Sequence, residues 1–161
     1  MTCPKCGKTG KQSTGLPWIV KWKRYNGDYP IVYRSSYELA FMRWLDNDTQ
    51  VIEWSSESFR IPYVDFSSVP PRQRTYFVDN SATYRIKDDK TGKWMKKKFL
   101  IEVKPYSQTI EPRKTENSAR YADGMLTFIK NMSKWKMAIQ YCADRGWGFK
   151  IVTEREIFKK K

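Results

Sequence analysis

The stretch FLIEVKPYS, residues 99–107, decides the fold because it combines the pattern of a buried strand with two opposite charges. Glu102 and Lys104 are two residues apart, so in a strand their side chains point to the same face. A half-buried strand ordinarily fills one face with aliphatic side chains. An acid and a base on one face therefore indicate either an ion pair on a solvated sheet or a chemical site.

The residues before this stretch predict a β-hairpin that brings a second acid to Glu102. Two strand-like runs, residues 74–86 and 94–104, are joined by KDDKTG, whose Asp, Thr and Gly are turn formers. If the hairpin is centred between the second Lys and the Thr of this loop, paired residue numbers sum to 181 and Asp79 lies opposite Glu102. A slip of one residue places the two acids on opposite faces, so the site depends on this register.

The remaining periodicities predict an α/β fold with a mixed central sheet, in which the hairpin carries the acids and helices pack on the sheet faces. Residues 109–117 are polar and predict a loop. The other predicted elements are a helix from Ser35 or Ser36 to about Leu45, strands at 51–54 and 58–63, a helix with its apolar face at 135–143, and a closing strand at 149–153.

A chain of 161 residues predicts one domain with extended ends. Residues 1–30 carry six cations and one acid without a sustained period, which predicts a basic N-terminal arm. Residues 31–156 contain the predicted helices and strands. Residues 157–161 form a short basic tail, with one helical turn expected around its start.

The charge balance favours a polyanionic partner. Lys and Arg outnumber Asp and Glu by 31 to 17, and seven Trp, ten Tyr and eight Phe are interleaved with these charges. This combination favours nucleic acid, while an acidic protein, a membrane surface and a merely cation-rich surface are the alternatives. No apolar run approaches the roughly 20 residues that span a bilayer, and no signal-peptide pattern is present, so a soluble intracellular protein without a membrane partner is expected.

The absence of histidine excludes whole classes of chemistry. Ser-His-Asp and Cys-His hydrolysis and histidine-ligated metal catalysis cannot be built from this chain. Asp79 and Glu102, with a strand carbonyl, instead suit Mg²⁺ or Mn²⁺. Lys104 beside them can orient a water molecule and stabilise charge on a phosphate. Glu38 adds a further carboxylate to this site, or is simply an acid favoured in the first turn of a helix.

Two cysteines near the N-terminus leave two hypotheses open. Cys3 and Cys6 in CPKCG have the spacing of half a zinc-binding knuckle, which needs further ligands from Cys142 with an acid, from a second subunit or from a partner protein. The alternative is a flexible arm with two free thiols. Cys142 itself lies on the apolar face of a predicted helix, where a buried structural cysteine is expected.

Basic and aromatic residues predict a DNA-binding surface. Arg34 and Ser35, just before the first helix, can hold a phosphate through a guanidinium and helix-start amides, although a plain N-cap explains Ser35 equally well. Trp18 and Trp22 are either stacking surfaces or core. The predicted DNA contacts are Lys21, Lys23, Arg24, Arg34, Ser35, Lys96, Lys97 and Lys98.

The order YRSSYE, YFVDN and LIEVKP matches the D-x(n)-E-x-K signature of the PD-(D/E)XK endonuclease superfamily. Further blocks, among them IEWSSESFRIPY and KWKMAIQYCADRGWGFKIVTE, make residues 18–156 resemble the head completion proteins of T-even-type tailed bacteriophages. This family in turn resembles the endonuclease subunit of a cut-and-paste transposase, so the chain is similar to that subunit as well. Two departures are Val78 in place of the motif's proline and the CPKCG segment, which has no counterpart in the family.

This resemblance implies a restriction-endonuclease-like core and a Mg²⁺-dependent DNA endonuclease of the PD-(D/E)XK class. The family acts in virion assembly, when the DNA-filled capsid is completed before tail joining. Glu38, Asp79, Glu102 and Lys104 fall on the nuclease positions. Enzymes of this fold often place a polar residue of the second helix near the metal, and the resemblance suggests Gln140 for that place. The implied partners are DNA, portal or neck proteins and a second copy of the chain, in the host cytoplasm during assembly or in the virion. The alternative function is a non-catalytic DNA-binding protein of the capsid vertex that retains the nuclease fold.

Overall fold

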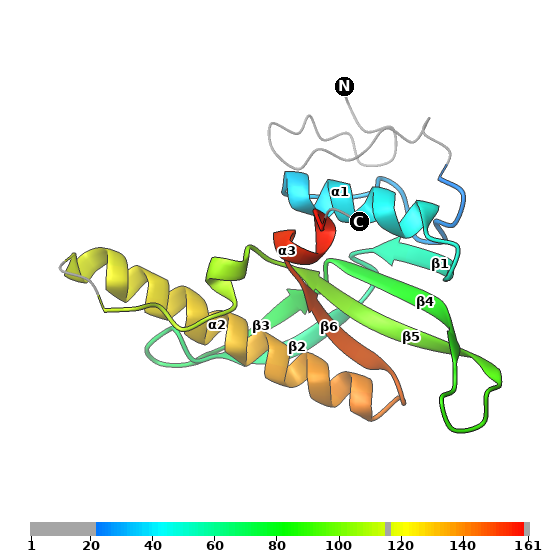
Figure 1. Ribbon diagram of the computed structural model, residues 1–161. Coiled ribbons are helices and arrows are strands. Elements are labelled where there is room, and N and C mark those ends of the chain that lie inside the picture. The colour runs from blue at the N-terminus through cyan, green and yellow to red at the C-terminus, as the bar shows by residue number, and fades with distance from the viewer. Residues whose placement is uncertain (1–21, 115–116, 160–161) are drawn as a thin grey trace.

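A four-stranded mixed sheet lies at the centre of the protein, in the order β1-β4-β5-β6 (Figure 1). The computed structural model describes residues 22–114 and 117–159. In the sheet β1, β4 and β5 are antiparallel neighbours, and β6 runs parallel to β5. The elements are α1 (Ser36–Asn47), β1 (Val51–Ser56), β2 (Arg60–Asp65), β3 (Arg72–Phe77), β4 (Asn80–Lys87), β5 (Trp94–Val103), η1 (Tyr106–Gln108), α2 (Ser118–Ala143), β6 (Gly148–Val152) and α3 (Glu154–Ile157).

The two faces of the sheet are covered by different elements. Helices α1 and α3 lie together on one face, whereas α2 and the two-stranded β2–β3 ribbon lie on the other (Figure 1). Alternation along β5 follows this division, because Ile101 and Val103 pack in the α1 core while Leu100 packs in the α2 core. Glu102 therefore belongs to the α2 face. This layered mixed α/β arrangement agrees with the predicted fold class.

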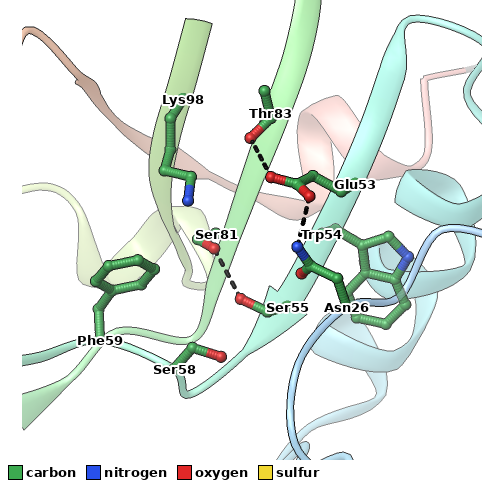
Figure 2. A pocket seen from close by; sticks show the side chains of 9 residues that line it. All are labelled: Asn26, Glu53, Trp54, Ser55, Ser58, Phe59, Ser81, Thr83 and Lys98. Atoms are coloured by element: carbon green, nitrogen blue, oxygen red, sulfur yellow. Dashed lines mark hydrogen bonds between the residues drawn. The ribbon is translucent and has the colours of Figure 1, made fainter.

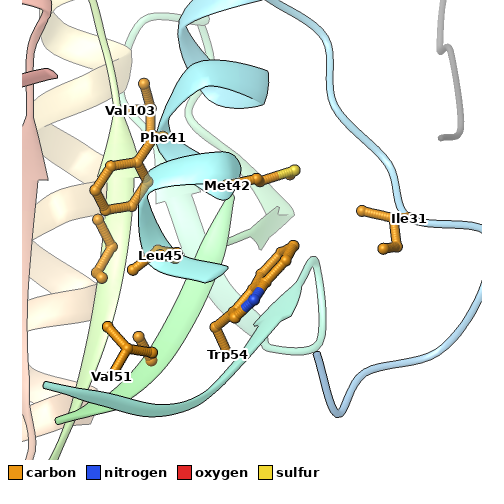
Figure 3. Packing of buried hydrophobic residues seen from close by; sticks show 9 residues of the cluster. Ile31, Phe41, Met42, Leu45, Val51, Trp54 and Val103 are labelled. Atoms are coloured by element: carbon orange, nitrogen blue, oxygen red, sulfur yellow. The ribbon is translucent and has the colours of Figure 1, made fainter. Parts of the chain in front are cut away.

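The core under α1 is built around Trp54, which is completely buried (Figure 3). Phe41 and Leu45, four residues apart on one face of α1, pack against the sheet in the same cluster. The rings of Trp22 and Tyr25 meet the Trp54 ring edge-on, with centroids 5.3 and 4.7 Å away. Part of the segment predicted as a basic arm thus packs on the sheet, and Trp22 contributes to the core.

The predicted hairpin register is confirmed. In the β4–β5 pair Asn80 lies opposite Ile101 and Lys87 lies opposite Trp94. The residue numbers of each pair therefore sum to 181, as predicted. The next residues outward from the first pair are Asp79 and Glu102. The turn is stabilised locally by Asp88, whose side chain accepts hydrogen bonds from two backbone amides of the loop. A loop with its own hydrogen bonds fixes the register by itself.

The prediction of one continuous strand over residues 74–86 is wrong. Strand β3 ends at Phe77 and pairs only with β2, while β4 begins at Asn80 and belongs to the central sheet. The amide of Val78 donates to the Phe59 carbonyl, and the Asp79 carbonyl accepts from the Glu57 amide. These long-range bonds turn the chain from the ribbon into the sheet, and Asp79 lies at this transition.

The second helix is longer than its apolar pattern indicated. Helix α2 begins at Ser118, with Asn117 as its N-cap accepting from the Arg120 amide, and its first turns are largely exposed. A helix that lies mostly in solvent carries little apolar periodicity, so its first half gave no signal. The expected loop before it lies between η1 and α2. Among the described residues, no helix has the length and apolar character needed to cross a membrane.

Candidate active site

Two acids, a lysine and a tyrosine converge on the α2 face, where β3 gives way to β4 and where β5 ends. Lys104 Nζ lies 3.1 Å from Glu102 Oε1. The Tyr76 hydroxyl donates to Glu102 Oε2 at 2.5 Å. The Val103 amide donates to Asp79 Oδ2 at 2.9 Å, which ties the second acid to the end of β5. The predicted group of Asp79, Glu102 and Lys104 is thus brought together by the hairpin.

Both carboxylates are buried, with exposed fractions of 8% for Asp79 and 1% for Glu102. Burial raises the pKa of Asp79 well above its ordinary value, and the neighbouring Glu102 carboxylate raises it further, while Lys104 acts in the opposite direction. Burial lowers the pKa of Lys104, but Glu102 and Asp79 outweigh this and raise it overall. The site therefore holds a firmly charged ammonium and one acid whose ionisation is costly in the absence of a further cation.

This electrostatic cost predicts that Asp79→Asn stabilises the metal-free protein. The pKa of Asp79 is higher in the folded than in the unfolded protein. The stability that protonated Asp79 contributes is therefore fully present below the unfolded pKa of about 3.9, and it is lost as pH rises through the folded pKa. Asparagine does not ionise, so the variant does not lose this stability as pH rises. In urea unfolding with chelator between pH 4 and 8, the variant should gain stability over the wild type as pH rises. A difference that does not change with pH would contradict the raised pKa.

The donor atoms fit a hard divalent cation. Mg²⁺ is commonly held by one or two carboxylates, with water and substrate phosphate completing the octahedron. Asp79 Oδ2 is occupied by the Val103 amide, whereas Oδ1 accepts no hydrogen bond from the described residues. Within 22–114 and 117–159, no three acidic or cysteine side chains approach closely enough to hold a metal ion together. The fit is therefore to a site with two protein carboxylates, Asp79 and Glu102.

Glu38 lies at the start of α1 with its carboxylate turned into the helix end. It is buried, and its oxygens accept from the Arg34 amide at 2.7 Å and the Ser35 hydroxyl at 3.1 Å. Ser35 is the N-cap and accepts from the Glu38 amide. The Glu38 charge nevertheless contributes to raising the pKa of Asp79. Glu38 thus hydrogen-bonds within the start of the helix, and its role as a metal ligand stays a prediction.

Two residues beside the acids were not identified from sequence. Tyr76 is buried, and burial together with the Glu102 charge raises its pKa, so it remains a hydrogen-bond donor to Glu102. Lys134 of α2 places Nζ 5.4 Å from the centre of the Tyr76 ring. Burial lowers the pKa of Lys134, with Lys104 adding to this and the two acids opposing it. No sequence pattern distinguishes Lys134 from the other lysines of α2.

Gln140 does not belong to this group. Its side chain is exposed and donates to Asp144 Oδ1 at 2.7 Å, one turn further along α2. The suggestion that Gln140 lies near a metal site is therefore wrong for this arrangement of the helix. The reason is the crossing point of α2, because Ala138 and Cys142 occupy the packed face at that end and turn Gln140 outward. Lys134, six residues earlier on α2, is instead a side chain on which the charges of Glu102 and Asp79 act.

A polar cavity of about 190 Å³ lies elsewhere on the same sheet face, over β1, β4 and β5 (Figure 2). Lys98 directs its ammonium into it, and its Nζ lies 5.4 and 5.1 Å from the ring centres of Phe59 and Trp147. Glu53 is held there by Asn26 and Thr83. The acids of the candidate site do not line this cavity, whose walls are Asn26, Glu53, Trp54, Ser55, Ser58, Phe59, Ser81, Thr83 and Lys98.

The other predicted DNA contacts are distributed over the surface. Lys96 is exposed and Lys97 half-buried on β5, whereas the side chain of Arg34 forms an ion pair with Glu57. The amides of Lys23 and Arg24 donate to Asp46 at 3.0 and 2.8 Å. The Arg24 guanidinium donates to the Asp46 carbonyl, so it is engaged within the fold. Cys3, Cys6, Trp18 and Lys21 lie outside the described residues.

Comparison with known proteins places this geometry in context. Residues 48–154 match the family described as TnsA-like endonuclease N terminal. The chain is also 34% identical over 148 residues to the head completion nuclease of Enterobacteria phage T4, an alignment that covers 85% of this chain and 89% of that protein. No solved structure matches. Asp79, Glu102, Lys104, Tyr76 and Lys134 all lie within the matched family region.

Proposed function

Since this chain belongs to the TnsA-like endonuclease family, we propose that it is a Mg²⁺- or Mn²⁺-dependent DNA endonuclease of the PD-(D/E)XK class that acts in phage head completion. The convergence of Asp79, Glu102 and Lys104 carries the proposal. Two buried carboxylates are expensive in a folded protein unless they serve a cation. The similarity to a head completion nuclease supplies the biological setting.

In this proposal Asp79 and Glu102 hold the metal ion, and Glu38 adds negative charge that favours the cation. Bound there, the ion would polarise the scissile phosphate and lower the pKa of a water molecule. Tyr76 fixes one Glu102 oxygen by its hydroxyl, which sets the direction of that carboxylate. Lys104 orients the attacking water and stabilises negative charge on the phosphate. The water oxygen bonds to phosphorus as the P–O bond to the departing sugar oxygen breaks, and a proton lost by the water ends on that departing oxygen.

DNA is the proposed substrate, and the excess of cations supplies the attraction to its backbone. Lys96 is exposed on β5, and Lys98, two residues along, lines the polar cavity. Both are proposed phosphate contacts. Lys21, Lys23, Arg34, Ser35 and Lys97 remain proposed contacts from sequence. Portal or neck proteins are proposed partners during assembly in the host cytoplasm. Zinc at Cys3 and Cys6 stays a prediction.

A non-catalytic DNA-binding role at the capsid vertex is the second candidate. One observation favours it, because Lys104 and Tyr76 already satisfy both oxygens of Glu102 without any metal. A Glu102 carboxylate with these two partners needs no metal ion to satisfy its oxygens. A metal ion must therefore compete with Lys104, and metal binding distinguishes the two functions.

Metal binding is expected to stabilise the folded protein through Asp79. At a Mg²⁺ or Mn²⁺ concentration about 100 times Kd, the free energy of unfolding should rise by about 2.7 kcal/mol. Thermal unfolding with metal and with chelator measures this rise in the wild type, in Asp79→Ala and in Asp123→Ala. Asp123 is an exposed acid of α2 and serves as the matched control. An equal rise in all three proteins, or none in the wild type, would contradict the proposed metal site.

A further inference from the structure

Lys134 occupies a position beside the candidate site that the proposed mechanism does not use. It lies on the part of α2 that crosses the β2–β3 ribbon, and its ammonium rests over the ring of Tyr76 at 5.4 Å from the centre. The Tyr76 hydroxyl in turn donates to Glu102. Lys104 reaches the other oxygen of the same carboxylate. Lys104 is therefore in direct contact with Glu102, and Lys134 rests over the ring of the tyrosine that donates to the same carboxylate.

The two lysines differ in their partners. Lys104 is ion-paired with Glu102, and Lys130, one turn before Lys134, lies 3.8 Å from Asp65. Among the described residues, no carboxylate lies within ion-pairing distance of Lys134 Nζ. The charges that act on it are those of Glu102, Asp79, Lys104 and Lys130. A half-buried ammonium that is not paired with a carboxylate retains hydrogen-bond donors for an incoming anion.

We propose that Lys134 contacts the scissile phosphate of bound DNA, as a second cation beside Lys104. The inference rests on the proposed nuclease function, because it requires a phosphate to be held at Asp79 and Glu102. A phosphate there carries negative charge that increases during attack by water. A preformed ammonium in a half-buried site stabilises that charge more strongly than one in bulk water. Lys134 is thus a catalytic residue for the same reaction.

The aromatic ring explains why Lys134 suits this role. A lysine in solvent loses much rotamer freedom when it binds a phosphate. Contact with the Tyr76 ring restricts the Lys134 side chain before substrate arrives, and the cation–π attraction holds the ammonium over the ring whose hydroxyl donates to Glu102. Tyr76 is itself fixed by burial and by Glu102. The contact between Lys134 and Tyr76 therefore aligns the second cation with the carboxylate that binds the metal.

The test compares Lys134→Met with Lys136→Met, an exposed lysine two residues along the same helix. Single-turnover cleavage is measured with saturating linear and branched DNA and Mg²⁺ or Mn²⁺, and DNA affinity is measured in chelator. We expect Lys134→Met to lower the cleavage rate constant about 10²-fold while DNA affinity changes little, because a donor to the reacting phosphate acts chiefly in the transition state. Lys134→Arg should recover part of the rate, and Lys136→Met should cut like the wild type.

Several outcomes would overturn the inference. A weaker affinity with an unchanged cleavage rate would make Lys134 an ordinary backbone contact, and a smaller salt dependence would identify it as such. Wild-type cleavage by Lys134→Met would leave the nuclease intact and remove Lys134 from it. A wild type that cuts no substrate with either metal would contradict the nuclease and the inference together. Thermal unfolding verifies that Lys134→Met is folded, and Lys134→Gln repeats the comparison with a shorter side chain.

Discussion

Asp79→Ala and Lys104→Ala are expected to abolish DNA cleavage while leaving DNA binding nearly unchanged. Asp79 offers an oxygen that is free of hydrogen bonds from the described residues, and Lys104 is the ammonium beside Glu102. Loss of either removes a group that acts on the reacting phosphate, so the rate should fall by about 10³-fold or more. DNA affinity comes mainly from many dispersed cations and should be retained.

The two effects are separated by measuring cleavage with Mg²⁺ or Mn²⁺ and binding with chelator on the same labelled DNA. Asp144→Ala and Lys136→Ala are matched controls, because both side chains are exposed, Lys136 on α2 and Asp144 at its C-cap. These controls should cut and bind like the wild type. Variants of Asp79 or Lys104 that lose binding but cleave normally once bound would sink the assignment of these residues to catalysis.

Trp54→Ala is expected to cost about 3–5 kcal/mol of the free energy of unfolding. The side chain is fully buried, and the rings of Trp22 and Tyr25 pack against it. Its indole N–H also donates to Asp46 Oδ1 at 3.0 Å. The substitution therefore leaves a large cavity under α1 and removes a hydrogen bond from a buried carboxylate. This loss is comparable with the total stability of many domains of this size.

Urea unfolding at neutral pH measures the effect, with Trp54→Phe as the matched comparison. Phenylalanine retains most of the apolar volume but not the hydrogen bond, so it should cost about 1.5–3 kcal/mol. A Trp54→Ala variant within about 0.5 kcal/mol of the wild type, the usual range of surface substitutions, would show that residues 22–30 do not pack as described.

The hairpin and its acids could be predicted from sequence because their determinants are local. The turn between β4 and β5 contains Asp88 and Gly92, which fix the register within the loop. Alternation along β5 then determines which face carries Glu102 and Lys104. The start of α1 was predictable for the same reason, since its N-cap Ser35 and first-turn Glu38 lie within four residues of each other.

The break between β3 and β4 could not be predicted, because it depends on partners far along the chain. The Val78 amide donates a hydrogen bond to the Phe59 carbonyl, and Asp79 accepts hydrogen bonds from the amides of Glu57 and Val103. No local turn signal marks Val78 or Asp79. The packing of Trp22 was equally undetermined, since an aromatic residue among cations fits a core or a stacking surface. Lys134 was missed because only the crossing of α2 over the ribbon separates it from other lysines.

The most direct test incubates the purified protein with linear, nicked and branched DNA, with Mg²⁺, with Mn²⁺ or with chelator, alongside Asp79→Ala. The wild type should cut at least one of these substrates only when a divalent metal is present, and Asp79→Ala should cut none. Salt-sensitive binding by the wild type without cutting of any substrate would contradict the nuclease and favour the structural role at the capsid vertex.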